Sequence, residues 1–96
     1  MNLSSLSAIS PLDGRYGSKT EELRPIFSEY GLMRFRVQVE LTWLKHLAAC
    51  EEIKEVPAFS KETIAFIDNI IANFSEEDAL DIKKREAVTN HDVKAV

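Results

Sequence analysis

Hydrophobic residues recur at helical spacing through the middle of the chain. The stretch RFRVQVEL alternates hydrophobic and polar residues, which taken alone is typical of a half-buried strand. Hydrophobic residues continue on both sides of this stretch without a turn signal, and they form two series at three- and four-residue steps. The pattern therefore predicts one helix, from about Ser28 to Glu52. The two series are Leu32, Phe35, Val39, Trp43 and Leu47, and Met33, Val37, Leu41, Leu44 and Ala48.

A helix with two hydrophobic faces must be buried on more than one side. At about 1.5 Å per residue, the predicted helix would be roughly 35 Å long. A chain of 96 residues cannot cover such a helix on both faces. We therefore expect it to pack against further protein.

Two shorter helices are predicted in the second half of the chain. Ser60 follows the connector KEVPAF and is placed to cap a helix in which Ile and Phe recur at three- and four-residue steps up to Phe74. Ser75 is placed to cap the next helix, which has acidic residues in its first turn and the basic run at 83–85 in its last turn. Since no strand prediction survives, the predicted fold class is all-α.

The beginning of the chain is predicted to be an arm. Residues 1–17 include the stretch SPLDGRYG, which predicts an extended arm with a tight turn at the Asp-Gly pair 13–14. Ser18 begins an S-x-x-E capping box and predicts a short helix that Pro25 ends. The predicted organisation is an arm followed by a helical domain at 18–96.

The last eight residues, TNHDVKAV, resemble the start of a helix without its end. Thr89 or Asn90 can cap this start, and Asp92 lies where the helix dipole favours a negative charge. The Gly, Pro or basic last turn that commonly ends a helix is missing. We therefore expect the chain to be the amino-terminal piece of a longer protein.

Composition excludes several classes of protein. Hydrophobic residues make up 45% and charged residues 29% of the chain, which is close to the average of globular domains. The net charge of −4 argues against a general nucleic-acid surface. The first residues do not resemble a secretory signal, so a cytoplasmic location is expected. Cys50 is the single cysteine and has no metal-ligand spacing with His46 or His91.

Standard catalytic motifs are missing, and two polar clusters remain as candidates. The first is Arg15 and Tyr16, which follow a glycine in the arm. A guanidinium group offers a planar fork of donors that suits phosphate or carboxylate, and a tyrosine adds a hydroxyl group. Spacing alone favours the alternative, in which the arginine pairs with a neighbouring carboxylate and the tyrosine lies on a helix.

The second cluster is Asn90, His91 and Asp92 at the predicted start of the last helix. Free backbone N–H groups at a helix start favour an anion, and a histidine there can donate a hydrogen bond or transfer a proton. The alternative is ordinary helix capping, for which Asn and Asp are common residues. The residues alone favour capping over a binding or catalytic role.

The sequence also resembles a known family. The stretches SPLDGRYG, FSEYGLMRFRVQVELTWLKHLA, IKEVPAF, FSEEDA and TNHDVKAV closely resemble, in the same order, the amino-terminal part of the bacterial adenylosuccinate lyase family. This family belongs to the fumarase/aspartase superfamily. The resemblance covers nearly the whole chain and is more specific than either cluster by itself.

The resemblance implies a fold and an activity. Family members are mostly helical homotetramers with a long central helix bundle, and three subunits contribute to each active site. They eliminate fumarate from adenylosuccinate to give AMP, and from the succinyl-carboxamide ribotide of purine biosynthesis, without a metal or organic cofactor. The chain is then expected to be the amino-terminal helical domain of the fumarase/aspartase-like fold, preceded by the extended arm.

The resemblance also implies roles for both clusters. Arg15 and Tyr16 match residues that contact the nucleotide, chiefly its phosphate. Asn90, His91 and Asp92 match residues that line the substrate site. The family's catalytic base and its usual acid lie in later segments, so His91 is expected to bind substrate and support the acid, with an acid role of its own as the alternative. The piece alone is expected to be inactive.

One hypothesis from another class competes with the lyase. In it, the chain is a free-standing helical protein-interaction module that uses the helix with two hydrophobic faces as its docking surface. The lyase hypothesis requires Arg15 and His91 to serve one anion site, whereas the module hypothesis leaves them independent.

Overall fold

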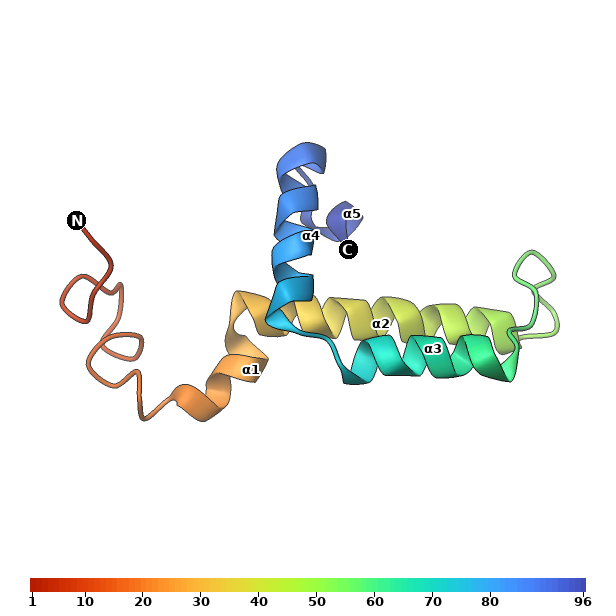
Figure 1. Cartoon of the computed structure of the whole chain (residues 1–96), viewed down its shortest axis with the longest axis horizontal. Coiled ribbons are helices and arrows are strands. Elements are labelled where there is room, and N and C mark those ends of the chain that lie inside the picture. Colours follow the sequence, from red (N-terminus) through yellow and green to blue (C-terminus); the bar gives the residue numbers. More distant parts are fainter. The chain divides into compact units, whose positions relative to one another are not determined.

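The computed structural model describes residues 1–96, which divide into two compact units, Met1–Gly31 and Leu32–Val96. The predicted all-α class is confirmed, because the chain contains helices and no strand. The predicted boundary between arm and helical domain, after residue 17, stays a prediction. The elements are η1 (Glu21–Leu23), α1 (Arg24–Phe27), α2 (Glu29–Ala49), α3 (Lys61–Ala72), α4 (Glu76–Thr89) and α5 (Asp92–Ala95) (Figure 1).

The first twenty residues contain no helix or strand, but they are not extended as predicted. The backbone folds into successive turns, of which one is closed by the Asp13 N–H donating to the Ser10 carbonyl oxygen at 3.0 Å. This turn has residues 11 and 12 at its centre, so it lies just before the Asp-Gly pair 13–14 at which the tight turn was predicted. Gly14 is needed there for close approach, since a Cβ on it would lie 2.5 Å from the backbone oxygen of Ser5.

The predicted short helix at Ser18 is wrong in its start and in the role of its proline. Thr20, not Ser18, precedes the 3-10 turn η1, and it provides no side-chain cap. Pro25 stands in the first turn of α1 and so helps to begin a helix instead of ending one. A proline suits this position because the first turn needs no N–H from it and its fixed φ is already helical.

Helix α2 is a single helix, as predicted, and RFRVQVEL is not a strand. Ser28 marks its start by accepting a hydrogen bond from the Gly31 N–H at 3.1 Å. The helix ends at Ala49, three residues before the predicted Glu52. The acidic residues that follow, Glu51 and Glu52, are unfavourable at the negative end of a helix dipole, and the chain turns there instead. Among the helices of this chain, none combines the length and the hydropathy that a membrane span requires.

The two hydrophobic faces of α2 differ in burial. Met33, Val37 and Ala48 are 5%, 8% and 6% exposed, so one series faces the interior. In the other series, Val39 and Trp43 are 64% and 61% exposed. The chain therefore covers one of the two faces, and the second face remains open on its own surface.

Helix α3 runs beside the later part of α2 in the opposite direction (Figure 1). Lys45 of α2 pairs with Asp68 of α3 at 2.5 Å. The predicted cap is confirmed, because the Ser60 side chain accepts a hydrogen bond from the Thr63 N–H at 3.1 Å. The helix buries Ile67.

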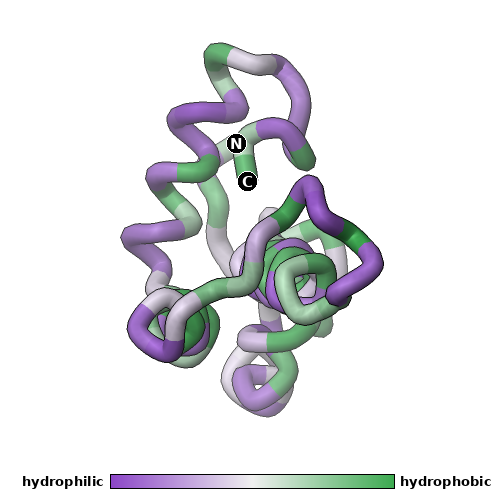
Figure 2. The backbone as a smooth tube through the Cα atoms, turned by 90° about the vertical axis from the view of Figure 1, so that its right-hand side faces the viewer, coloured by the Kyte–Doolittle hydropathy of each residue, from purple (hydrophilic) through white to green (hydrophobic).

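Helix α4 begins as predicted and ends later than predicted. Ser75 and Asp78 form a reciprocal capping box, in which each side chain accepts from the other residue's N–H. The helix continues past the basic run at 83–85 to Thr89, because the following Glu and Ala favour a helix. Short hydrophilic and hydrophobic stretches follow one another along it (Figure 2), and α5 packs against it.

We expect the substitution Gly31→Ala to destabilise the protein. A Cβ on Gly31 would lie 2.5 Å from the Ile26 carbonyl oxygen and 2.6 Å from that of Pro25. At an open helix position alanine would gain up to about 1 kcal/mol over glycine, but crowding of packed backbone costs about 1–3 kcal/mol. We expect a net loss of about 1 kcal/mol and a Tm lower by about 4–8 °C in calorimetry.

The matched control is Gly17→Ala, whose Cβ would approach no atom closer than 3.1 Å. It should change the Tm less than Gly31→Ala does. An unchanged or higher Tm for Gly31→Ala would show that α1 is not held against the start of α2.

Candidate functional site

The connection between α4 and α5 presents the second predicted cluster. Asn90 ends α4 in the left-handed conformation, with φ 52° and ψ 34°, and its N–H donates to the Glu86 carbonyl oxygen at 2.7 Å. Asparagine tolerates this conformation better than most residues with a side chain. The prediction that Thr89 or Asn90 caps the last helix is therefore wrong, because Asn90 closes the preceding helix.

His91 is the residue that caps α5. Its Nδ1 accepts a hydrogen bond from the Lys94 N–H at 3.2 Å. An accepting Nδ1 carries no proton, so in the neutral ring the proton is on Nε2. The side chain lies at the exposed surface, where Nε2–H is a hydrogen-bond donor with a fixed direction.

Thr89 holds the backbone of His91 from the preceding turn. Its hydroxyl group donates to the His91 carbonyl oxygen at 3.1 Å and lies 3.3 Å from the His91 nitrogen, whose N–H donates to it. Backbone and ring of His91 are thus fixed by separate hydrogen bonds. Such fixed donors favour binding, because less conformational entropy is lost when a ligand arrives.

Both carboxylate oxygens of Asp92 accept hydrogen bonds from protein groups. Oδ2 accepts from Nη1 of Arg36 on α2 at 2.8 Å, and Oδ1 accepts from the Val93 N–H at 2.8 Å. The hydrogen bond from Arg36, helped by that from the Val93 backbone, lowers the pKa of Asp92 below its ordinary value. The predicted role of Asp92 as a direct substrate ligand therefore gains no support from its contacts.

This lowered pKa fixes the pH range in which the ion pair contributes to stability. The contribution is fully present above the pKa of an unfolded aspartate, about 3.9, and is lost as the pH falls through the lower value of the folded state. Since the side chain of Asp92 is 51% exposed, solvent screens the pair and the contribution is small.

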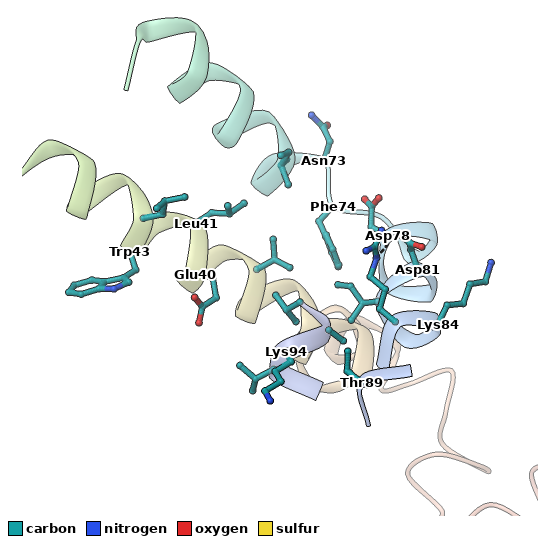
Figure 3. Close-up of a pocket in the computed structure, with 18 of the residues that line it drawn as sticks. Glu40, Leu41, Trp43, Asn73, Phe74, Asp78, Asp81, Lys84, Thr89 and Lys94 are labelled. Atoms are coloured by element: carbon teal, nitrogen blue, oxygen red, sulfur yellow. Dashed lines mark ion pairs between the residues drawn. The ribbon is translucent and has the colours of Figure 1, made fainter. Parts of the chain in front are cut away.

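A wide hollow of about 1530 Å³ lies between α2, α3, α4 and α5 (Figure 3). Its walls are mostly hydrophobic, and Phe74 reaches into the space beside α4 (Figure 3). Two acidic residues that line it already have partners in the protein, since Asp78 belongs to the capping box and Asp81 pairs with Arg85 at 3.5 Å. The hollow is also lined by Thr89, Val93 and Lys94 of the α4–α5 connection.

The predicted cluster lies next to this hollow, not in its lining. Asn90, His91 and Asp92 are flanked in sequence on both sides by residues that do line it, and all three are exposed. The structure thus brings these three residues to one short connection, as predicted. No group of three His, Cys, Asp or Glu side chains is arranged to hold a metal ion.

The first cluster lies in the other compact unit, Met1–Gly31. The backbone around it is fixed, because the Tyr16 N–H donates to the Pro11 carbonyl oxygen at 2.8 Å and the Thr20 hydroxyl donates to the Leu12 carbonyl oxygen at 3.0 Å. Arg15 makes no ion pair, and its guanidinium group lies 5.3 Å from the centre of the Tyr16 ring. The alternative of an arginine tied to a carboxylate and a tyrosine on a helix is therefore wrong.

Sequence reasoning missed the parts that Arg36 and Thr89 play in the second cluster. Arg36 belongs to the stretch RFRVQVEL, 56 residues before its partner Asp92, so no local signal could have identified it. Thr89 is a predicted helix cap and instead holds the backbone of the neighbouring histidine.

Both clusters lie within the part of the chain that matches known proteins. The family model described as lyase matches residues 14–96. Adenylosuccinate lyase of Escherichia coli strain K12 is 65% identical over 96 residues, that of Vibrio cholerae 64% and that of Haemophilus influenzae 60%. Each comparison covers 100% of this chain and 21% of the relative, so the chain spans about a fifth of the length of these curated relatives.

The capping role of His91 can be tested locally by amide hydrogen exchange at Lys94. We expect His91→Ala to speed that exchange about fivefold, because loss of a helix cap costs about 1 kcal/mol. His91→Asn is the matched control, since asparagine is itself a strong capping residue and should keep exchange slow. If both variants left exchange unchanged, the Nδ1 hydrogen bond and the assigned tautomer would be wrong.

Proposed function

Because the chain belongs to the lyase family, we propose that it is the amino-terminal part of an adenylosuccinate lyase. The observation that carries this proposal is identity of 60–65% over all 96 residues to three relatives of that name. The substrates are then adenylosuccinate, which gives AMP, and the succinyl-carboxamide ribotide of purine biosynthesis, both with release of fumarate.

The proposed reaction is a β-elimination. A base removes a proton from Cβ of the succinyl group, and the adjacent carboxylate stabilises the resulting carbanion. The carbon–nitrogen bond then breaks, its electron pair goes to the nitrogen, and an acid protonates that nitrogen. As in the family resemblance, the base and the usual acid come from segments outside these 96 residues, so this chain supplies binding groups and is inactive alone.

Arg15 and Tyr16 are the proposed phosphate-binding groups. The structure supports this role in two respects: the backbone of their turn is fixed by hydrogen bonds, and the Arg15 guanidinium group has no carboxylate partner. A planar guanidinium can donate two parallel hydrogen bonds to a phosphate. The Tyr16 ring, which lies beside it, supports its orientation through a cation–π contact.

His91 is the proposed donor to the succinyl part of the substrate, with Asn90 beside it. The Nε2–H that results from capping by Nδ1 can donate to a carboxylate or to charge that develops in the transition state. This supports a binding and charge-stabilising role for His91 over an acid role. Asp92 is proposed to line the site only indirectly, since both of its oxygens bind other groups.

Assembly and location follow from the same proposal. We propose a cytoplasmic homotetramer in which the site needs more than one subunit, and no metal or organic cofactor takes part. The open face of α2 supports packing against further lyase chain. The alternative of a free-standing interaction module has no support in the comparisons, in which the chain matches lyases over its full length.

The activity is tested by an assay of fumarate release from adenylosuccinate with the complete protein that the gene encodes. We expect turnover from that protein and none from a polypeptide of residues 1–96. A folded complete protein that released no fumarate from either substrate would refute the proposed function.

Arg15 is tested by substitution in the complete protein. We expect Arg15→Ala to raise the KM for adenylosuccinate about 10- to 100-fold, because a hydrogen bond to a charged group contributes about 1.5–3 kcal/mol. Arg15→Lys should lie between the two, since lysine keeps the charge without the planar fork. Lys19→Ala, an exposed cation in the same turn region, is the control and should leave KM within about twofold. If Arg15→Ala and Lys19→Ala raised the KM equally, the effect would come from net charge alone, and the proposed role of Arg15 as a specific phosphate ligand would be wrong.

A further inference from the structure

We infer that Arg36 is a positioning residue for the substrate site, and that its ion pair with Asp92 holds His91 in place. The inference rests on the proposed function and extends it to a helix that the family resemblance did not connect with the site. It concerns two residues that act through a third, since neither the guanidinium of Arg36 nor the carboxylate of Asp92 needs to touch substrate.

The first observation is that the pair links two helices. Arg36 lies on α2, and Asp92 is the first residue of α5, immediately after His91. The distance of 2.8 Å between Nη1 and Oδ2 is that of a charge-assisted hydrogen bond. The four-residue helix α5, which could not be stable by itself, is thereby tied to a helix of 21 residues.

The second observation is that the hydrogen bonds to His91 itself fix only its local conformation. Thr89 bonds to its backbone, and Lys94 donates to its ring. Both partners are within three residues of His91, so they would move together with the connection. The Arg36–Asp92 pair joins residues that are 56 positions apart, and it holds the α4–α5 connection against α2.

The third observation is the exposure of the pair. The side chains of Arg36 and Asp92 are 29% and 51% exposed, so the pair is screened by water and contributes little to global stability. Its loss should leave the fold intact and release the connection. A displaced catalytic or binding group reduces the rate even when it is still present.

The test is a set of variants in the complete protein, with fumarate release, Tm and substrate KM as readouts. We expect Arg36→Ala and Asp92→Asn each to lower kcat about tenfold with little change in Tm. The double variant should be no worse than either single one, because both remove the same contact. Arg36→Lys should restore most of the rate, since it keeps a cationic donor.

A second cycle asks whether the pair acts through His91. In the His91→Asn background, which keeps a capping residue but lacks Nε2–H, Arg36→Ala should cause no further loss of kcat. Lys45→Ala is the matched control, because it breaks a different ion pair that joins α2 to a neighbouring helix. It should leave kcat within about twofold.

The outcomes separate the two proposals. If the unsubstituted complete protein releases no fumarate, the proposed function fails and this inference fails with it. If that protein is active and the Arg36 and Asp92 variants keep full kcat, or if Arg36→Ala lowers kcat equally with and without His91, the inference alone is overturned.

Discussion

The Leu32–Val96 unit depends on the burial of a small set of hydrophobic side chains contributed by several helices. Met33, Val37 and Ala48 come from α2, and α3, α4 and α5 each add one or two more; none of the seven buried residues is less than 5% exposed. At about 25 cal/mol per Å² of apolar surface, such a thin core holds helices in place without locking every side chain. This constraint explains why the helix ends are secured by hydrogen bonds. Ser60, Ser75 and His91 each accept from a backbone N–H that would otherwise have no partner.

Structural features that depend on contacts between residues three or four apart were predicted well from the sequence. The start of α2 at Ser28 and the caps at Ser60 and Ser75 were predicted, since each depends on a side chain that bonds to an N–H three residues later. Errors arose where two local signals competed. Pro25 can end a helix or begin one, and which it does depends on the turn before it, which the sequence does not fix. Asn90 can cap the start of a helix or end one, and here the continuation of α4 decided in favour of an end.

The candidate site, too, was predicted only in part from the sequence. Its residues were identified from the sequence largely by family resemblance, since spacing alone left each cluster open to an ordinary structural explanation. The capping of α5 by His91 and the contact of Asp92 with Arg36 were not predicted. The first requires knowing where α4 ends, and the second requires knowing which residue of α2 faces α5. Neither is a property of a short stretch of sequence, because each depends on how helices pack.

The ordinary structural explanation and the functional one are compatible at His91. Capping uses Nδ1 as a hydrogen-bond acceptor, so the proton of the neutral ring is on Nε2 and the ring is held in one orientation. A residue that did not cap would be free to rotate, and ordering it on binding would reduce affinity. In the same way Asp92 begins α5 and bonds to α2, so its carboxylate organises the connection without needing to touch a ligand. The helix-capping chemistry that first argued against a site is therefore what makes this connection suitable for one.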